Sequence, residues 1–276
     1  MSDTAKFIIK GETFEFPIVV GTEGEHAIDI STLRGRTNYV TIDNGFVNTG
    51  SCQSAITFLN GEKGILRYRG YPIEQLADHS SFREVSFLLN YGELPNEREL
   101  IDFNRKVAHF ERLPEGVKKI IDAFPTTAHP MGVISSATAS LASFYPEYLN
   151  LLTSEQKDDA IPHLMSQMKM MIAYYYRRTQ NLTEVDSNPD FSYAGDFLNM
   201  MFGGGEYKVD AKVADALDDL LILHADHEQN CSASTVRVVG SSQANVFASI
   251  SGGINALWGQ LHGGANQAVL EMLEEM

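Results

Sequence analysis

The feature that most constrains the fold of this chain is a change in the spacing of its apolar residues at Pro72. Beyond this proline, apolar side chains recur every three or four residues, in runs such as Val85, Leu88 and Leu89; Leu100, Phe103, Val107 and Phe110; and Val117, Ile120, Ile121 and Phe124. This spacing places the apolar side chains on one face of an α-helix. Proline and glycine interrupt the pattern at short intervals, so we predict a mainly α fold of ordinary-length helices with tight connections.

The first 71 residues show a different pattern. Short β-prone runs at residues 7–9, 14–20 and 27–30 are separated by glycines, which is typical of strands and turns. Residues 56–59 and 65–68 flank an Asn60-Gly61 pair, which tolerates positive φ and predicts a hairpin. We therefore predict a small N-terminal β-rich region at residues 1–71 and a helical large domain at residues 72–276.

Composition excludes several classes of partner. A net charge of −15 argues against nucleic acid and anionic membrane, because binding to phosphate requires clustered lysines and arginines. The two cysteines, Cys52 and Cys231, have no metal-knuckle or disulfide-framework spacing. The N-terminus has no signal-peptide pattern, and no run of 18 apolar residues occurs. We expect a cytoplasmic protein that does not insert in a membrane.

Three histidines gather in the last fifth of the chain. His224 and His227 extend the spacing of Val213, Leu217 and Leu220, so we expect both imidazoles to point into the protein. Asp226 and Glu228 flank this stripe, and for them a solvated face or a capping role is the simpler interpretation.

His262 lies between Gly259 and Gly263, just before a helical pattern resumes. At a helix N-terminus the unsatisfied backbone NH groups disfavour an imidazolium, so we expect a neutral imidazole that donates a hydrogen bond. Such a donor suits an enolate oxygen. The neighbouring glycines are explained equally by a turn and by the approach of a ligand to the backbone.

Small residues at four-residue spacing, Ala244, Ala248, Gly252 and Ala256, predict a helix that another helix approaches closely. The second helix could come from the same chain or from a partner subunit. We expect a homo-oligomer.

Two other classes of function remain open from the residues themselves. His224 and His227 with His262 could be metal ligands, although the sequence lacks a His-Glu-x-x-His motif. A non-catalytic helical oligomer would explain the small-residue stripe, but it would leave the inward histidines without a role.

The motifs in this region resemble those of citrate synthase, of the bacterial type. The resemblance rests on His224-Ala-Asp-His-Glu-Gln-Asn230, Ser234-Thr-Val-Arg237, Gly240-Ser-Ser242, Leu257-Trp-Gly259 and His262-Gly-Gly-Ala-Asn266. It extends to Gly64-Ile-Leu66, Arg69-Gly-Tyr71, Gly92-Glu-Leu-Pro95, His129-Pro-Met131 and Phe197-Leu-Asn-Met-Met201, and so spans nearly the whole chain.

The resemblance implies condensation of acetyl-CoA with oxaloacetate and water, without a metal or other cofactor. It implies that His262 is catalytic and polarises the acetyl carbonyl group. It also implies that His227, Asn230 and His224 bind oxaloacetate. Members of the family are largely helical, with a large and a small domain, and form dimers or hexamers.

The resemblance also implies groups that this sequence lacks: a second active-site histidine, an aspartate base, and arginines that hold the oxaloacetate carboxylates. We therefore expect a fragment in which the large domain is incomplete and the small domain is not completed, inactive by itself. A 2-methylcitrate synthase that uses propionyl-CoA is the nearest enzymatic alternative, since one methylene changes binding by only about 1 to 3 kcal/mol.

Overall fold

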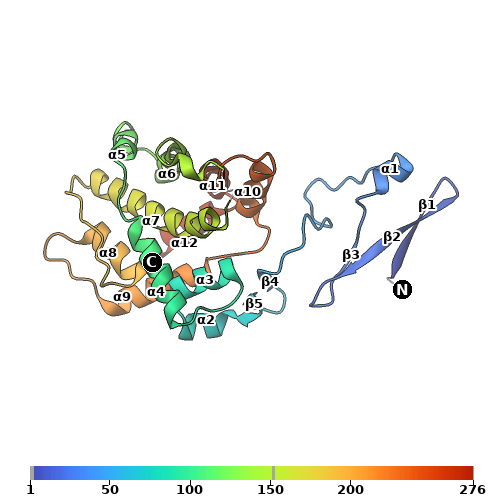
Figure 1. Cartoon of the computed structure of the whole chain (residues 1–276), viewed down its shortest axis with the longest axis horizontal. Helices are drawn as coiled ribbons and strands as arrows, with labels where there is room; N and C mark the ends of the chain where they lie inside the picture. Colours follow the sequence, from blue (N-terminus) through green and yellow to red (C-terminus); the bar gives the residue numbers. More distant parts are fainter. Residues whose placement is uncertain (1–2, 151–152, 276) are drawn as a thin grey trace. The chain divides into compact units, whose positions relative to one another are not determined.

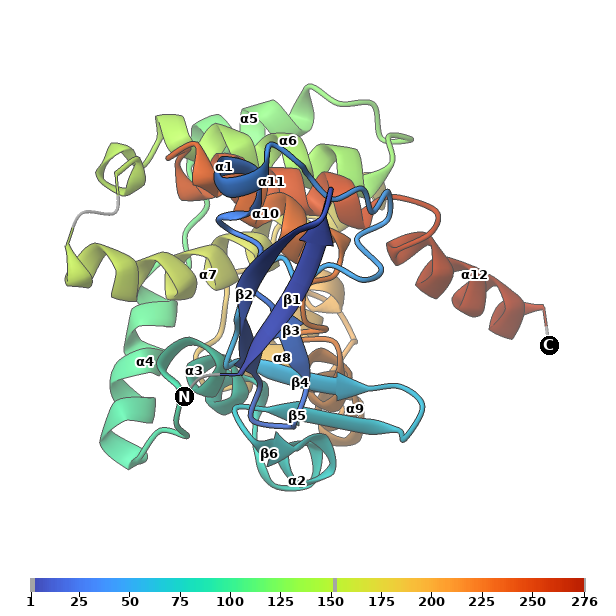
Figure 2. The same cartoon turned by 90° about the vertical axis from the view of Figure 1, so that its right-hand side faces the viewer.

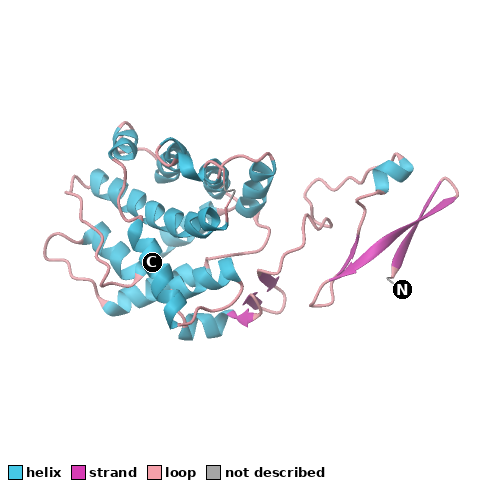
Figure 3. Cartoon of the chain, viewed as in Figure 1, coloured by secondary structure: helices cyan, strands magenta, loops and turns pink. Residues whose placement is uncertain are grey.

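The structure, a computed structural model, describes residues 3–150 and 153–275 and divides into two compact units. The first unit is Met1–Ser54 and the second is Ala55–Met276. Strands are few and helices dominate the second unit (Figure 3). The predicted mainly α fold with a small N-terminal β region is confirmed.

The first unit is built on a three-stranded antiparallel sheet. Its elements, in chain order, are β1 (Thr4–Ile9), β2 (Glu12–Val20), β3 (His26–Ile28) and the short helix α1 (Leu33–Thr37). Phe16 on β2 is fully buried, and its ring lies 5.0 Å from that of Phe7 on β1. The Arg36 guanidinium of α1 lies 5.0 Å from the Phe16 ring. Phe16 of β2 and Leu33 of α1 are the buried apolar side chains among the described residues of this unit, with Phe7 and the Arg36 guanidinium against the Phe16 ring.

The second unit begins with the predicted hairpin and continues with helices (Figure 1). The hairpin strands are β4 (Thr57–Asn60), β5 (Ile65–Tyr68) and β6 (Tyr71–Pro72), all antiparallel. The α-helices are α2 (Ile73–His79), α3 (Phe82–Tyr91), α4 (Glu97–His109), α5 (Glu115–Asp122), α6 (Pro130–Ser140), α7 (Ser154–Thr179), α8 (Tyr193–Phe202), α9 (Ala211–Leu223), α10 (Cys231–Ser241), α11 (Val246–Leu257) and α12 (Gly263–Glu274). Two short 3₁₀ helices, Leu141–Ser143 and Pro146–Tyr148, precede α7.

The largest helix, α7, is the centre of the main core. It packs against α4, α6 and α8, and in Figure 1 it runs between α6 and α8. Buried apolar side chains of α7, such as Met171, contact buried residues of α5, α6, α8 and α11. One continuous core therefore supports the helices on both sides of α7.

A second, smaller hydrophobic core joins the hairpin to the helices. Tyr68 of β5 is fully buried and packs with Leu76 of α2, Leu88 of α3 and Ile222 of α9. The hairpin therefore packs within the second compact unit, which begins at Ala55. The predicted domain division at residues 1–71 and 72–276 stays a prediction. The spacing of apolar residues marks where helices start, but it does not show what a hairpin packs against.

The small residues of α11 allow α10 to approach closely, as their spacing predicted. A Cβ atom added at Gly253 would lie 2.7 Å from a methyl carbon of Val236. One added at Gly252 would lie 3.3 Å from a methyl carbon of Val239. On its other side α11 packs against α6, where the Ser135 and Ser251 hydroxyl oxygens are 3.0 Å apart. The close helix pair thus lies within one chain.

The last helix, α12, projects away from the helical body in Figure 2. Its apolar side chains Val269, Leu270, Met272 and Leu273 are more than half exposed. The predicted helix after His262 is present, but its apolar residues do not join the main core.

Among the helices that the structure describes, none combines the length and the apolar character that crossing a membrane requires.

Candidate active site

His224 and His227 lie at the end of α9 and beyond it, and both side chains are exposed. His224 is the C-cap of α9, and its Nδ1 atom lies 2.8 Å from the carbonyl oxygen of Leu220. The two imidazole centroids are 6.3 Å apart. The prediction that both histidines point into the protein is therefore wrong.

The error has a physical cause in the composition of α9. This helix carries two overlapping apolar stripes, and three-to-four spacing by itself does not show which stripe is buried. Ala214 and Ile222 are buried, whereas Val213 and Leu220 are about half exposed. His224 continues the exposed stripe, and α9 ends at Leu223, so the helical spacing no longer places His227. Both histidines are exposed and accessible to a ligand from solution.

The loop that carries His227 is held by the β4–β5 hairpin. The Thr57 hydroxyl donates to the Asp226 carboxylate, and the Leu59 backbone NH donates to Glu228 Oε1 at 2.8 Å. Glu228 has a φ of 56°, which marks a tight bend in the loop. The two carboxylates beside the histidines therefore tie the loop to a strand about 170 positions earlier in the sequence.

Tyr68 is the buried centre of this attachment. Its hydroxyl accepts from the Asp226 NH at 3.2 Å and shares its proton between the carbonyl oxygens of Ile222 (3.1 Å) and Asp226 (3.0 Å). Burial raises the pKa of Tyr68, so the phenol keeps its proton. We refer to the contacts of Thr57, Leu59 and Tyr68 with residues 222–228 as the hairpin latch.

Asn230 is the N-cap of α10. Its Oδ1 atom accepts from the Ala233 backbone NH at 2.9 Å, as expected of asparagine at this position. The acceptor end of the amide is thus engaged in the helix, and the amide NH2 group is the end with donor capacity for a ligand.

His262 is the N-cap of α12, which agrees with the predicted position just before a helix. Its side chain is partly buried and does not cap the helix. Instead, Nε2 lies 2.9 Å from the Ser232 hydroxyl oxygen on the first turn of α10. The same hydroxyl oxygen lies 3.0 Å from the carbonyl oxygen of Gly253 on α11.

The direction in which the Ser232 hydroxyl donates determines the tautomer of His262, because a hydroxyl group has only one proton to donate. When the hydroxyl donates to the Gly253 carbonyl, its oxygen accepts from Nε2–H of His262. When the hydroxyl donates to Nε2, the neutral imidazole carries its proton on Nδ1. The second arrangement makes Nδ1 a donor for a ligand.

Gly263 is required by the tight turn that follows His262. A Cβ atom at this position would lie 2.4 Å from the carbonyl oxygen of Leu257. The backbone NH groups of His262 and Gly264 both bond to the carbonyl oxygen of Gly259, at 3.0 and 3.2 Å. Backbone hydrogen bonds within residues 259–264 therefore hold the turn together.

The structure brings the predicted residues together in two sets. His224 lies beside His227, while His262 reaches, through Ser232, the helix that Asn230 caps. Sequence reasoning did not identify Ser232, because it is one of several serines in a run of small residues and nothing in its spacing marks it.

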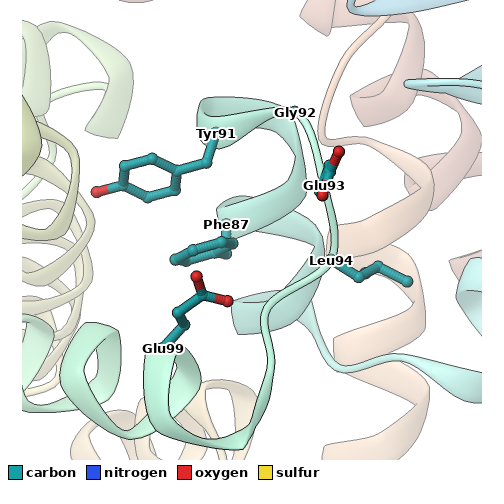
Figure 4. A pocket seen from close by; sticks show the side chains of 6 residues that line it. All are labelled: Phe87, Tyr91, Gly92, Glu93, Leu94 and Glu99. Carbon is teal, nitrogen blue, oxygen red and sulfur yellow. The ribbon is translucent and has the colours of Figure 1, made fainter.

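Within residues 3–150 and 153–275, no cluster of three or more histidine, cysteine, aspartate or glutamate side chains is arranged to hold a metal ion. A pocket between α3 and α4 is formed by other residues: Phe87, Tyr91, Gly92, Glu93, Leu94 and Glu99 (Figure 4). Glu99 there is engaged in capping α4 through the Asn96 NH. This pocket is separate from the histidines.

Comparison with known proteins gives a consistent result. Residues 45–276 match the family described as citrate synthase, C-terminal domain. Citrate synthase 1 of Mycobacterium tuberculosis is 46% identical over 274 residues, which is 99% of this chain and 64% of that protein. The citrate synthase of Corynebacterium glutamicum is 47% identical over 268 residues, 96% of this chain and 61% of that protein.

Solved structures agree with the sequence matches. Citrate synthase of the archaeon Thermoplasma acidophilum, in a ternary complex with carboxymethyl coenzyme A and oxaloacetate, superposes with a TM-score of 0.79 at 29% identity. The aligned region includes 85% of this chain and 61% of the Thermoplasma acidophilum chain. The enzyme of Thermotoga maritima gives a TM-score of 0.74 at 31% identity, with the same coverage. The chain thus spans less than two thirds of the length of these relatives.

Proposed function

The chain belongs to the citrate synthase family, and from this premise we propose that the protein condenses acetyl-CoA with oxaloacetate and water to give citrate and free CoA. The reaction needs no metal or redox cofactor in this proposal. The ligands named for the Thermoplasma acidophilum enzyme, a coenzyme A derivative and oxaloacetate, support the choice of substrates.

The observation that carries the proposal is the contact of His262 with Ser232 at the start of α12. The Ser232 hydroxyl donates to the Gly253 carbonyl in the structure, and rotation of its proton to Nε2 of His262 leaves the neutral ring with its own proton on Nδ1. Nδ1 then donates to the thioester carbonyl oxygen. That oxygen gains negative charge as the methyl group loses a proton, so the hydrogen bond strengthens in the transition state. His262 is thereby the catalytic donor for enolisation.

Oxaloacetate is assigned to the loop before α10. The His227 ring is exposed and can donate to a keto or carboxylate oxygen of the substrate. The Asn230 NH2 group can make a second contact, since its oxygen is engaged by Ala233. His224, whose Nδ1–H donates to the Leu220 carbonyl, places a second imidazole ring beside His227 in the proposed oxaloacetate site.

We also propose that the 276-residue chain by itself does not complete the reaction. The family resemblance assigns the aspartate base, a second histidine and the carboxylate-binding arginines to segments that this sequence does not contain. Charge-assisted bidentate pairs supply most of the recognition of a dicarboxylate. Oxaloacetate-dependent release of CoA thiol by the purified 276-residue chain would contradict this part of the proposal.

The proposed function is tested by His262→Ala in the protein as its gene encodes it. We expect kcat for CoA release to fall by about 10² to 10⁴, the usual contribution of one positioned proton donor. His227→Ala should mainly raise the KM for oxaloacetate. His26→Ala, which changes an exposed histidine of the first unit, is the control and should be neutral. Full activity in His262→Ala would refute the assignment.

Substrate choice between acetyl-CoA and propionyl-CoA is a separate measurement. We propose acetyl-CoA, and kcat/KM for the two thioesters, measured side by side with oxaloacetate, checks it. A higher value for propionyl-CoA would identify a 2-methylcitrate synthase instead.

The expected homo-oligomer and the cytoplasmic location stay predictions.

A further inference from the structure

Trp258 is the only tryptophan in the chain, and it lies at the C-cap of α11, four positions before His262. Its ring stacks on the imidazole of His129, with centroids 4.8 Å apart and planes 26° apart. A Cβ atom added at Gly132 would lie 3.3 Å from two carbon atoms of the indole. The indole therefore lies closely over the first turn of α6.

His129 has two separate contacts at this place. Its Nδ1 atom accepts from the Met131 backbone NH at 3.2 Å, so the side chain is the N-cap of α6. The flat face of the same ring meets Trp258. The cap stabilises α6 itself, whereas the stack joins α6 to the end of α11, and the two contacts can be removed one at a time.

The stack lies at the end of α11 that leads directly to His262. The hydrogen-bonded contact of Ser135 on α6 with Ser251 on α11 is seven residues and so about 10 Å further back along α11. Between the stack and His262 the side chains of Gln260 and Leu261 are exposed. The turn thus has little side-chain packing of its own.

The turn transmits the position of Trp258 to His262. Gly259 follows Trp258 immediately, and its carbonyl oxygen accepts from the NH groups of both His262 and Gly264. A shift of Trp258 would move this carbonyl and, with it, the ring that must stay 2.9 Å from the Ser232 hydroxyl.

We propose that the stack of Trp258 on His129 is the positioning contact that fixes the turn of residues 259–262 and keeps the His262 ring on Ser232. Trp258 and His129 act through His262 and are not catalytic residues. The effect of this contact on catalysis rests on the function proposed above. Its effect on the position of the turn can be tested without measuring enzyme activity.

The test uses the isotopically labelled 276-residue chain and two variants that lose the stack. His129→Asn keeps an acceptor for the Met131 NH, because asparagine is a good N-cap, but removes the flat ring. Trp258→Leu removes the indole. We expect amide exchange at His262 and Gly264 to become at least tenfold faster in both, and the His262 ring resonances to shift.

Two control variants complete the design. Trp258→Phe retains an aromatic ring and should restore exchange at both amides to within about threefold of the wild-type rates. His79→Asn, an exposed histidine at the end of α2, should change neither amide. Emission of the single tryptophan reports directly on the loss of the stack in His129→Asn.

Exchange at His262 and Gly264 within twofold of wild type in both variants without the stack would overturn the proposal. Equal effects of Trp258→Phe and Trp258→Leu would also overturn it, as would loss of protection at the Met131 amide in His129→Asn, because that would mean fraying of α6. In the protein as its gene encodes it, His129→Asn should lower kcat and leave the KM for oxaloacetate unchanged. A wild-type protein without citrate synthase activity would contradict the proposed function. The exchange rates at His262 and Gly264 would still test the positioning contact.

Discussion

His163 is a titratable side chain in an aromatic core. It is 1% exposed, and its ring centroid lies 4.1 Å from that of Tyr145 and 4.5 Å from that of Phe110. Its Nε2 atom has no hydrogen-bond partner among the described residues. Burial lowers the pKa of His163 to about 4, and the Asp159 carboxylate opposes the shift only in part. The histidine is therefore neutral in the folded protein near pH 7.

The lowered pKa predicts a loss of stability in mild acid. Between pH 6.5 and 4 the unfolded chain binds a proton at His163 that the folded chain does not, so the free energy of unfolding falls as the pH falls. The loss from pH 7 to pH 5 should be about 2 kcal/mol. Urea unfolding at both pH values measures it, and His163→Leu should show a pH-dependent loss smaller by that amount. An equal loss in wild type and variant would contradict the prediction.

Ser232 is a second residue whose effect can be isolated. Ser232→Ala removes the partner of His262 Nε2, and a single lost hydrogen bond of about 1 kcal/mol corresponds to roughly a five- to tenfold fall in kcat. Ser234→Ala is the matched control, because its hydroxyl donates to the Gln229 carbonyl and not to His262. Steady-state kinetics of the protein as its gene encodes it checks this, and equal effects of the two variants would refute a specific role for Ser232.

At the scale of elements, the hairpin latch joins β4 and β5 to the loop that carries His227. Tyr68→Phe leaves the buried ring in place but removes the hydroxyl that contacts Ile222 and Asp226. The unpaired backbone groups should cost about 1 to 3 kcal/mol of the free energy of unfolding. Tyr71→Phe, on the neighbouring strand and exposed, should cost less than about 0.5 kcal/mol. Urea denaturation of both variants measures their free energies of unfolding. Losses of similar size would contradict a stabilising role for the hairpin latch.

The elements also show which predictions local sequence can make. The hairpin at residues 57–68 and helices α3, α4 and α5 lie where turn residues and apolar spacing predicted them. The approach of α10 to α11 followed from small residues at four-residue spacing. These features depend on neighbours within one or two helical turns.

At the scale of the whole molecule, one buried ion network joins α7, α8 and the segment after α4. The Lys169 ammonium group is fully buried and lies 2.6 Å from carboxylate oxygens of both Glu111 and Asp196. The Ser187 hydroxyl lies 2.6 Å from the same two carboxylates. The network therefore connects the segment after α4 with α7, the loop before α8, and α8 itself.

Removing the cation should destabilise the whole second unit. Lys169→Met leaves two buried carboxylates without their counter-ion, which costs about 3 to 5 kcal/mol. Lys106→Met breaks a more exposed pair with Asp159 and should cost less than about 1 kcal/mol. Urea unfolding of the two variants measures the difference, and losses of similar size would show that the network contributes no more than a surface ion pair.

The mainly α class, the hairpin, and the place of His262 before a helix could be predicted from the sequence, because each depends on local spacing and turn chemistry. The sequence did not determine that His224 and His227 are exposed, that the hairpin joins the helical unit, or that Ser232 meets His262. Those outcomes depend on which of two apolar stripes is buried and on contacts between residues 30 to about 170 positions apart. Only the tertiary structure decides them, since such contacts are selected by the packing of the whole unit and leave no periodic mark in the chain.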